Sequence, residues 1–569
     1  MTLDTFFEKF DLFADAPDAV AKMRELVVEL AVSGKLCEPL PKPEKHPAWL
    51  TFRKEISERI YSYDPGRPPP FEIPEHWEWC VLDEVADCRA AAKVSPASIK
   101  DTDWVLDLED IDGASGQVVQ TATFADRRSL STKAAFDPGD VLYGKLRPYL
   151  NKVVVAADRG FCTTEIIPLR PAPFLTPEFL RFYLRSQTFL RYAAQKNYGM
   201  KMPRLGTKDL ESAEIPVPPP AEQKRIVAKV DELMALCDRL EAQQQERETR
   251  HAALARASLA RFADAPTPAN LHFLFHKSYP IPPADLRKSI LTLAVQGKLV
   301  PQDPNDEPAE ELVRRLLAEK ARLLAAGELN REKAIPPLDD ASVPYGLPNG
   351  WCWSRLGDLS HCVTSGSRDW AAHYSDEGAI FVRMGNLSRI SYRLRMDKVQ
   401  HVMPPSNAEG NRTRLEAGDV LISITGEVGL LGLIPDGFGE AYINQHTCLV
   451  RLPAELRNRF IPEFFRSPFA QGYFNAPQRG LKNSFRLTDV TTMPVPIPPL
   501  AEQRRIVAIV EQLMALVDAL ETQLAASRAT AANLLSALVA ELTGTRHTGK
   551  VSVPATTTTG RRGRPRKSA

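Results

Sequence analysis

The chain has 569 residues, enough for three or four domain-sized units, and its 44% hydrophobic and 25% charged residues are ordinary for a globular protein. Lys and Arg number 72 and Asp and Glu 71, so the formal net charge is +1. This balance excludes a uniformly basic DNA-coating protein, but it leaves room for a local basic surface. The 8 cysteines form no C-x-x-C pair, no apolar run approaches ~18 residues, and the start lacks a secretion signal. We therefore expect a cytoplasmic protein with reduced thiols and no membrane span.

The chain contains an internal duplication with a spacing of about 280 residues. Pro216–Gln243 (PVPPPAEQKRIVAKVDELMALCDRLEAQ) and Pro496–Gln523 (PIPPLAEQRRIVAIVEQLMALVDALETQ) are identical at 19 of 28 positions. Weaker matches follow in the same order: Ala31–Leu36 with Ala294–Leu299, Pro74, Trp77 and Trp79 with Pro348, Trp351 and Trp353, Gly139–Leu142 with Gly418–Leu421, and Pro177–Phe179 with Pro462–Phe464. This spacing is too long for a solenoid repeat, so it indicates two related domains.

Each copy of the strongly matched segment is predicted to form a long helix, entered through a proline run and with Glu222 or Glu502 in its first turn. Apolar residues then recur in alternating steps of four and three, which is typical of helices packed along their length. Such a helix packs either on its own domain or on the other helix, and two similarly patterned helices in one chain favour the second arrangement. The residues assigned to helix packing are Ile226, Val230, Leu233, Leu240, Ile506, Val510, Leu513 and Leu520. The second pattern can continue through Leu534 and Leu538, whereas the first is lost after Leu240.

The stretches between the helices predict mixed α and β domains. Short strands are expected at Trp104–Ile111, Asp140–Tyr143, Phe381–Leu387 and Asp419–Ile424, and helix is expected at Pro177–Tyr192. The tryptophans that alternate in each half are predicted to be core residues. No phosphate loop, G-x-G-x-x-G, H-E-x-x-H, G-x-S-x-G or Asn-Pro-Pro-aromatic motif occurs, so the sequence offers no catalytic signature.

Polar, basic and aromatic residues crowd corresponding turns of the two halves. These turns are Tyr143–Lys152, Thr163–Glu165 and Lys196–Arg204 in the first half, and Ser365–Trp370, Asn444–His446 and Arg479–Arg486 in the second. Arg, Asn and Gln read base edges, whereas Lys and Ser mostly hold phosphates. A solvated surface loop explains any one cluster, but parallel placement in both copies favours DNA binding. The candidate DNA-binding residues, with two from the basic tail, are Lys145, Arg147, Tyr149, Asn151, Lys152, Lys201, Arg204, Arg368, Arg383, Asn386, Asn444, Gln445, Lys482, Asn483, Arg486, Arg562 and Arg564.

On these motifs the chain resembles the specificity subunit of type I restriction-modification enzymes. The resemblance rests on the duplicated P-x-P-P-x-A-E-Q-[KR]-R-I-V segment behind a variable α/β domain, and on Gly139–Lys152, Asn444–His446 and Ala294–Pro304. It implies a fold of the α/β (α+β) class with two pseudo-repeated target recognition domains, separated by two long antiparallel coiled-coil helices. Each domain would read one part of a bipartite target in double-stranded DNA. The chain itself would be non-catalytic.

The resemblance also implies a multisubunit complex. The long helices would set the spacing between the half-sites, because a helix of 25–40 residues spans ~40–60 Å against ~34 Å for one DNA turn. They would also dock two methyltransferase subunits, and two motor-nuclease subunits would join outside. S-adenosylmethionine, ATP and Mg²⁺ would be used by these partners, and this chain would hold no cofactor and no metal.

The domain organisation follows from the repeats. We expect an N-terminal helical segment over 1–40, target recognition domain 1 over 41–215, the central helix over 216–265, and a repeat-start helical segment and linker over 266–345. Target recognition domain 2 is expected over 346–495, the C-terminal helix over 496–543, and a disordered basic tail over 544–569. The tail sequence Gly560–Lys567 resembles an AT-hook, and a tail that attracts phosphates without preference is an equal alternative.

Two other functions remain as alternatives. A solitary DNA-binding or scaffolding protein would have the same helices but no restriction-modification partners. A fused enzyme with a diverged active site is the third alternative.

Overall fold

The computed structural model divides into two compact units, each described here by itself. It describes residues 16, 18–38, 49–52, 54, 70–127, 130–199, 201–276, 279–330, 334–339, 343–366, 369–404, 412–476 and 485–543. Unit 1 comprises Met1–Glu246 with Ala526–Ala569, and unit 2 comprises Arg247–Ala525. The boundaries therefore fall inside the two long helices, α9 (Pro220–Asp264) and α18 (Leu500–Thr543), each of which contributes to both units. In the described residues, no helix is long and apolar enough to cross a membrane.

Unit 1 is an α+β domain with helices on its sheets. Its first elements are α2 (Ala19–Val32), β1 (Glu78–Val81), α4 (Leu82–Val85), β2 (Ala86–Asp87), β3 (Lys93–Val94), η2 (Pro96–Ser98), β4 (Val105–Leu106), η3 (Leu108–Asp110), β5 (Ile111–Asp112), β6 (Gln117–Val118) and α5 (Phe124–Arg127). There follow β7 (Lys133–Phe136), β8 (Val141–Gly144), η4 (Pro148–Leu150), β9 (Val153–Val155), β10 (Gly160–Thr163), β11 (Ile166–Pro171), α6 (Pro177–Arg185), α7 (Gln187–Lys196), α8 (Thr207–Glu211) and β12 (Glu214–Val217).

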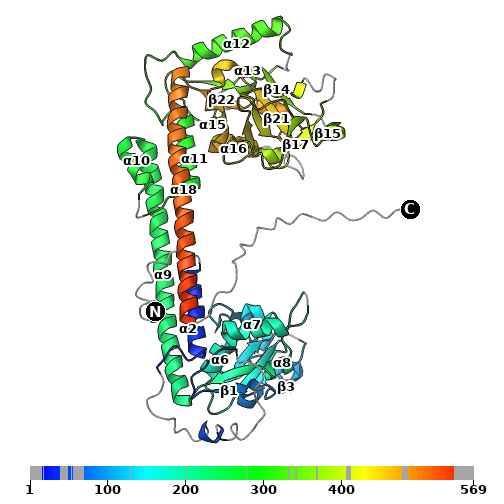
Figure 1. Cartoon of the computed structure of the whole chain (residues 1–569), viewed down its shortest axis with the longest axis vertical. Coiled ribbons are helices and arrows are strands. Elements are labelled where there is room, and N and C mark those ends of the chain that lie inside the picture. The colour runs from blue at the N-terminus through cyan, green and yellow to red at the C-terminus, as the bar shows by residue number, and fades with distance from the viewer. Residues whose placement is uncertain are drawn as a thin grey trace, which may run out of the picture. The chain divides into compact units, whose positions relative to one another are not determined.

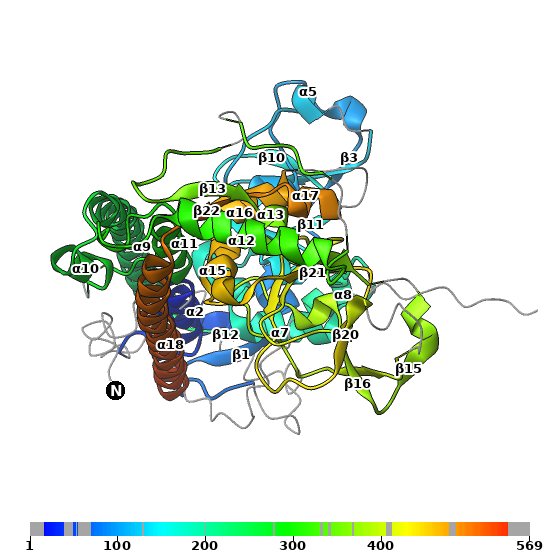
Figure 2. The same cartoon turned by 90° about the horizontal axis from the view of Figure 1, so that it is seen from above.

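Unit 2 repeats this plan. Its elements before the domain are α10 (Pro268–Leu274), α11 (Pro283–Val295) and α12 (Ala309–Ala325), and α12 packs on β13 and α13, which Figure 2 shows from above. The domain consists of β13 (Cys352–Arg355), α13 (Leu356–Leu359), β14 (Cys362–Ser365), η6 (Asp369–His373), β15 (Tyr374–Ser375), β16 (Ala379–Val382), η7 (Met384–Asn386), β17 (Gln400–Val402), β18 (Val420–Ser423), β19 (Leu431–Leu433), β20 (Ala441–Ile443), β21 (Thr447–Arg451), η8 (Ala454–Leu456), α15 (Phe460–Arg466), α16 (Pro468–Asn475), α17 (Leu487–Thr491) and β22 (Pro494–Ile497).

The sheets correspond between the units, with one difference. Unit 1 has the strand orders β2-β11-β8-β9 and β3-β7-β10-β4, and unit 2 has β14-β21-β18-β19 and β15-β17-β16-β20. A parallel pair stands at the edge of each second sheet, β4 with β10 and β16 with β20. The further strands extend from β10 in unit 1 but from β16 in unit 2. The predicted mixed α and β class is confirmed, and the strands expected at Trp104–Ile111 and Phe381–Leu387 are each interrupted by a short 3₁₀ turn.

Each long helix is buried at both ends, but in different units. Ile226, Val230 and Leu233 of α9 share one core with Leu535 near the end of α18, and Figure 1 shows that end of α18 beside α2. Ile506, Val510 and Leu513 of α18 share the core of unit 2 with Phe262 near the end of α9. In each unit the start of one helix therefore packs near the end of the other, which is an antiparallel arrangement. Both predicted packing modes therefore occur. The apolar residues at the start of each long helix pack on their own domain, and the far end of the other long helix packs in the same core.

The far ends of the helices carry their own apolar contacts. The row of α9 is interrupted after Leu240, but the helix continues to Asp264 and buries Ala255 and Phe262. In α18 the buried residue is Leu535, whereas the predicted Leu534 is 37% exposed. Leu538, also predicted, is partly buried against the core of unit 1.

An arginine ties a short helix to the middle of each long helix. Arg24 of α2 binds Asp238 and Glu241 of α9, both at 2.7 Å, and Arg287 of α11 binds Asp518 at 2.6 Å and Glu521 at 2.7 Å. The carboxylates are more than half exposed, so each ion pair contributes much less to the free energy of unfolding than a buried ion pair would. The repeated geometry orients α2 and α11 equivalently.

The repeated motifs form a clasp that holds each domain to the start of its long helix. The buried Trp77 donates its indole N–H to Glu222 Oε1 at 3.2 Å, and Trp351 donates to Glu502 Oε2 at 3.0 Å. Gly34 and Gly297 have φ angles of 74° and 67°, and a Cβ on either would lie 2.5 Å from a proline beside the tryptophan. The clasp thus explains why the blocks that contain Gly34 and Trp77 recur in the second half. The prediction of core tryptophans is confirmed for Trp77 and Trp351, whereas Trp79 and Trp353 are only partly buried.

The clasp of unit 2 has a consequence for pH dependence. Burial, as the largest cause, raises the pKa of Glu502 above its ordinary value, although Gln302 and Trp351 donate hydrogen bonds to it. The folded form therefore holds this proton more tightly than the unfolded chain, and the stability that it contributes is lost as pH rises through the folded pKa. We expect the stability of Glu502→Gln relative to wild type to increase between about pH 4 and about pH 7. Urea titrations across this range measure it, and a pH-independent difference would refute the linkage.

Candidate nucleic-acid interface

Three polar turns of unit 1 that are distant in the sequence meet at the ends of β8 and β11. Lys145 N–H donates to Glu165 O at 2.9 Å, and Leu205 N–H donates to Lys145 O at 3.0 Å. Arg147 N–H donates to Pro203 O at 2.7 Å. The backbone therefore brings together the turns that sequence analysis selected separately, Tyr143–Lys152, Thr163–Glu165 and the described part of Lys196–Arg204.

Unit 2 builds a corresponding cluster with two of these backbone bonds. Ile424 N–H donates to His446 O at 2.9 Å, and Phe485 N–H donates to Ile424 O at 2.8 Å. Asn444–His446 therefore stands where Thr163–Glu165 stands in unit 1. The turn after β18 occupies the place of the turn after β8.

The predicted side chains of unit 1 differ in how far the fold already engages them. Arg204 pairs with Glu165 at 3.0 Å, and Lys152 Nζ donates to Leu108 O at 2.5 Å. Asn151 Nδ2 donates to Arg185 O at 3.2 Å. Tyr149 is 63% exposed and Lys201 is exposed, whereas the side chain of Arg147 makes no hydrogen bond or ion pair with a described residue and its Nε is buried. Lys145 is half-buried.

In unit 2 the candidates Asn386 and Asn444 each hold a turn. Asn386 is buried, accepts a bond from Arg383 N–H, and donates to Arg395 O and Lys398 O. Asn444 Oδ1 accepts from His446 N–H at 3.1 Å. Gln445 lies half-buried beside the His446 ring at 3.0 Å, and Arg486 is exposed. Contact of any of these side chains with DNA stays a prediction.

Five candidates lie outside the described residues. They are Arg368, Lys482, Asn483, Arg562 and Arg564. Within the described part of the chain, no group of His, Cys, Asp and Glu is arranged to hold a metal ion.

The turns are supported by a buried aspartate that pairs with an arginine in both units. Asp140 is bound by Arg170 at 3.0 Å, and Asp419 is bound by Arg451 at 2.7 Å. Burial, as the largest cause, raises the pKa of Asp419, and the guanidinium of Arg451 opposes that shift. The aspartates of the matched Gly-Asp-Val-Leu blocks thus fix the strands from which the polar turns project.

A second repeated arginine, which sequence analysis missed, fastens a loop in each unit. Arg185 donates to the carbonyls of Gly113 at 3.1 Å and Ala114 at 2.8 Å, and Arg466 donates to that of Ile390 at 2.9 Å. Arg466 also pairs with the buried Glu463 at 2.7 Å, whereas Arg185 lacks such a carboxylate among the described residues. Burial, with the nearby Arg181 adding to it, lowers the pKa of Arg185 to about 10.

The position of this arginine corrects one of the sequence matches. Trp77 packs edge-on against Phe179 with ring centroids 6.1 Å apart, and Trp351 packs in the same way against Phe460, also at 6.1 Å. Phe179 therefore corresponds to Phe460 and not to Phe464. Matching the Pro-Glu-Phe triplets shifts the helix by about one turn, because the identical residues stand on successive turns.

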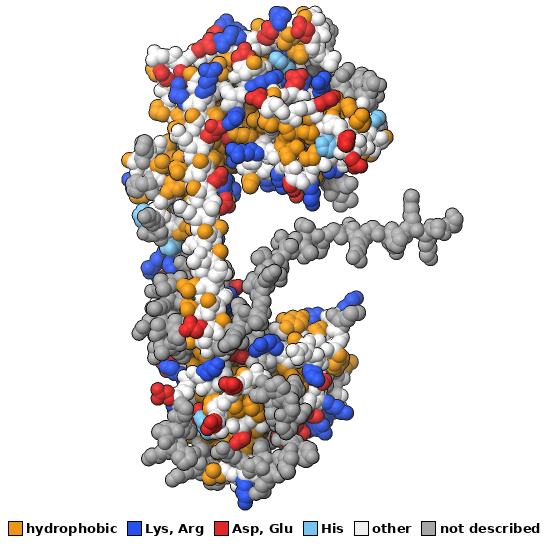
Figure 3. Space-filling model, in the orientation of Figure 1, with side chains coloured by type: hydrophobic (Ala, Val, Ile, Leu, Met, Phe, Trp, Pro, Cys, Tyr) orange, Lys and Arg blue, Asp and Glu red, His pale blue; other side chains and the backbone are white. Residues whose placement is uncertain are grey.

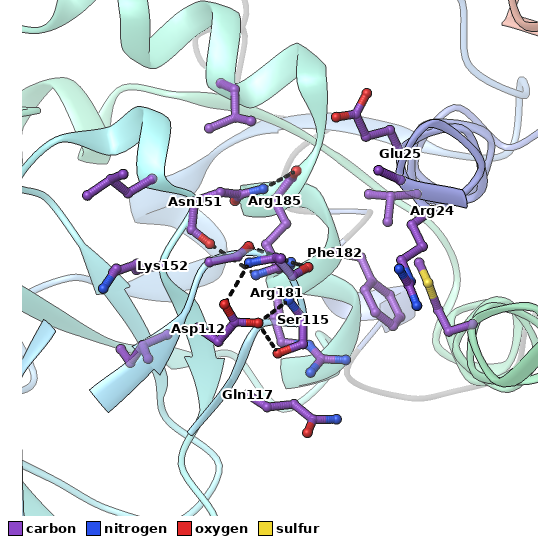
Figure 4. A pocket seen from close by; sticks show the side chains of 18 of the residues that line it. Arg24, Glu25, Asp112, Ser115, Gln117, Asn151, Lys152, Arg181, Phe182 and Arg185 are labelled. Carbon is purple, nitrogen blue, oxygen red and sulfur yellow. Dashed lines mark hydrogen bonds between the residues drawn. The ribbon is translucent and has the colours of Figure 1, made fainter. Parts of the chain in front are cut away.

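Arg185 lies in a cavity of about 1200 Å³ within unit 1. Figure 4 shows its guanidinium between Asn151 and the Asp112–Ser115 turn, with Arg24 of α2 on the opposite wall. Arg181 also lines the cavity, and its buried Nε has no hydrogen-bond partner among the described residues. The walls carry both acidic and basic side chains, so the cavity has no single sign of charge.

Charge alone does not locate an interface on the surface. On the face that Figure 3 shows, Lys and Arg side chains are interspersed with Asp and Glu and with hydrophobic side chains over both units. The duplicated turn cluster, which presents exposed polar and aromatic side chains on a braced backbone, is therefore the stronger indication of a recognition site.

Comparisons with known proteins agree with this geometry. The family model described as "Type I restriction modification DNA specificity domain" matches residues 132–248 and 348–527. Two relatives from Escherichia coli, the type I restriction enzyme EcoEI and EcoAI specificity subunits, are each 27% identical over 577 residues, covering 93% of this chain and 94% of the relative. A solved chain from a study of complex assembly and conformational transition of the type I R-M system superposes with a TM-score of 0.51 at 22% identity, covering 83% of this chain and 99% of that chain, which supports the fold.

Duplicated α+β domains with matching turn clusters, joined to long antiparallel helices, are the architecture of a DNA sequence-recognition protein. The chain belongs to the family of type I restriction-modification DNA specificity subunits.

Proposed function

We propose that each unit reads one part of a bipartite DNA target through its turn cluster. The observation that carries this proposal is the correspondence of the clusters: corresponding backbone bonds hold the turns after β8 and β18, while the side chains on them differ. Equal frames with different side chains are expected of two readers of different sequences.

We further propose that α9 and α18 set the spacing between the half-sites. The helices have 45 and 44 residues, and at ~1.5 Å per residue each extends over roughly 66 Å. One DNA turn is ~34 Å, so helices of this length exceed the separation of two adjacent reading sites. Their exposed faces are proposed to dock two methyltransferase subunits.

The chain is proposed to act without catalysis of its own. Two methyltransferase subunits would bring S-adenosylmethionine, and two motor-nuclease subunits would use ATP and Mg²⁺. The E. coli relatives EcoEI and EcoAI are specificity subunits of type I restriction enzymes, which supports this division of work.

The experiment is methylome sequencing of a host that expresses the chain with its methyltransferase, compared with the same host lacking the chain. We expect a bipartite methylated motif only when the chain is present. As an internal control, replacing residues 41–215 with the corresponding part of another specificity subunit should change one half of the motif and leave the other half and the gap unchanged. An unchanged methylome with the partner expressed would contradict the proposal, and absence of a co-purifying methyltransferase would favour a solitary binding protein.

A further inference from the structure

The turn after β8 is held in an unfavourable backbone conformation at both of its ends. Arg147 has a φ angle of 52° and Asn151 one of 53°, with the 3₁₀ turn Pro148–Leu150 between them. The left-handed region disfavours residues that carry a Cβ and suits glycine. Arginine at this position therefore costs stability that glycine would not.

Unit 2 of the same chain has a glycine at the position that corresponds to Arg147. Gly144 N–H donates to Lys152 O, and Ser423 N–H donates to Leu430 O, both at 2.9 Å. Counting from these bonds and from those of Lys145 and Ile424, Gly426 stands at the position of Arg147. It has a φ angle of 73°, and Gly429, at the position of Asn151, has one of 83°.

The contacts of Asn151 account for its presence, whereas those of Arg147 do not. Asparagine tolerates this conformation, and its amide reaches Arg185 O. The bond of Arg147 to Pro203 uses only the backbone N–H, which a glycine also has. Its guanidinium is uncommitted within the described chain, and Nε is buried without a partner. Strain that nothing in the fold compensates is typical of functional positions.

The surroundings of Arg147 suit a ligand that carries acceptors. It lines a cleft of about 400 Å³, together with Asp107, Glu109 and Glu165. These carboxylates already have partners, because Arg127 binds Asp107 and Glu109 and Arg204 binds Glu165. The planar guanidinium of Arg147 can therefore donate two parallel hydrogen bonds to an external group. In the major groove of DNA, the O6 and N7 atoms of guanine accept such a pair of bonds.

We propose that Arg147 is a specificity-determining residue of unit 1 that reads a guanine in its half of the target. Unit 2, with Gly426 at the same place, reads its half without an equivalent contact. The inference rests on the proposed function, since it names the contact by which one of the two units discriminates.

The test uses the full chain with its methyltransferase and compares wild type, Arg147→Gly and Arg147→Lys. Thermal unfolding of Arg147→Gly should occur within about 2 °C of wild type or above it, because relief of strain offsets the added freedom of the unfolded chain. In the methylome, discrimination at one G·C position of one half-site should fall about ten- to a hundred-fold. Arg147→Lys should keep overall affinity but lose that discrimination, because an ammonium lacks the planar fork.

Arg459→Gly is the matched control. Arg459 also has a positive φ of 72°, but it pairs with Glu511 at 2.6 Å and directly precedes α15, outside the residues of the turn cluster. Its replacement relieves the same kind of strain and should leave the motif unchanged. An uncompensated loss of stability in Arg147→Gly, an equal loss of affinity for all sequences, or an unchanged motif would each overturn the inference. A wild-type complex with no bipartite motif would instead overturn the proposed function itself.

Discussion

Leu535→Asp is expected to unfold unit 1, although residue 535 follows the last residue of the domain, Val217, by more than 300 positions. Leu535 is fully buried in the core that holds Ile226 and Val230. Removing a buried leucine costs about 2–5 kcal/mol, and an unpaired buried carboxylate adds several more. The free energy of unfolding of unit 1 should therefore fall by at least ~4 kcal/mol.

Hydrogen exchange resolves the effect by unit. Amides of β8 and β11 should lose protection in the variant, while those of β18 and β21 keep theirs, because Leu535 contributes only to the core of unit 1. The neighbouring Leu534 is 37% exposed, so Leu534→Asp is the matched control and should cost less than about 1 kcal/mol. Equal exchange in both units, or equal effects of the two variants, would show that the end of α18 does not complete unit 1.

The sequence predicted the long helices, the mixed class and the strands after each Gly-Asp turn, because these depend on local periodicity and on glycine. It did not show which core each apolar row enters. That requires the far end of the other helix, and the interrupted row of α9 after Leu240 conceals Ala255 and Phe262. Contacts between residues so far apart in the sequence produce no periodic pattern of apolar residues from which they could be predicted.

Of the candidate site, the sequence predicted the turns but not the state of their side chains. Residue type alone grouped Arg147 with Arg204 and Asn386, yet Arg204 is paired, Asn386 holds a turn, and only Arg147 is uncommitted among these three. The left-handed backbone at Arg147 also cannot be predicted from the sequence of the first half alone. Its alignment with Gly426 would have indicated a positive φ, but that alignment requires the strand register from the structure.

Gln223→Leu is expected to detach domain 1 from the start of α9. Gln223 is fully buried, and its Oε1 accepts from Thr176 N–H at 2.7 Å. Its Nε2 donates to Pro218 O at 2.7 Å and to Phe174 O at 2.9 Å. Leucine has similar bulk but leaves these three backbone groups without a partner, each at a cost of about 1–3 kcal/mol. We expect a loss of about 3–6 kcal/mol in the free energy of unfolding, measured by urea titration.

The duplication supplies a graded comparison for this prediction. In unit 2 the equivalent Gln503 donates to Pro498 O at 2.9 Å and accepts from the side chain of Asn458 at 2.7 Å. Gln503→Leu leaves one backbone carbonyl without a hydrogen-bond donor. Asn458 is part-buried and can bind water instead, so the loss in the free energy of unfolding should be about half as large. Lys224 is the next residue of α9 and is exposed, so Lys224→Leu should leave the free energy of unfolding nearly unchanged. If Gln223→Leu were as mild as Lys224→Leu, the buried amide would not be what joins the domain to its helix, and the matched A-E-Q motif would need another explanation.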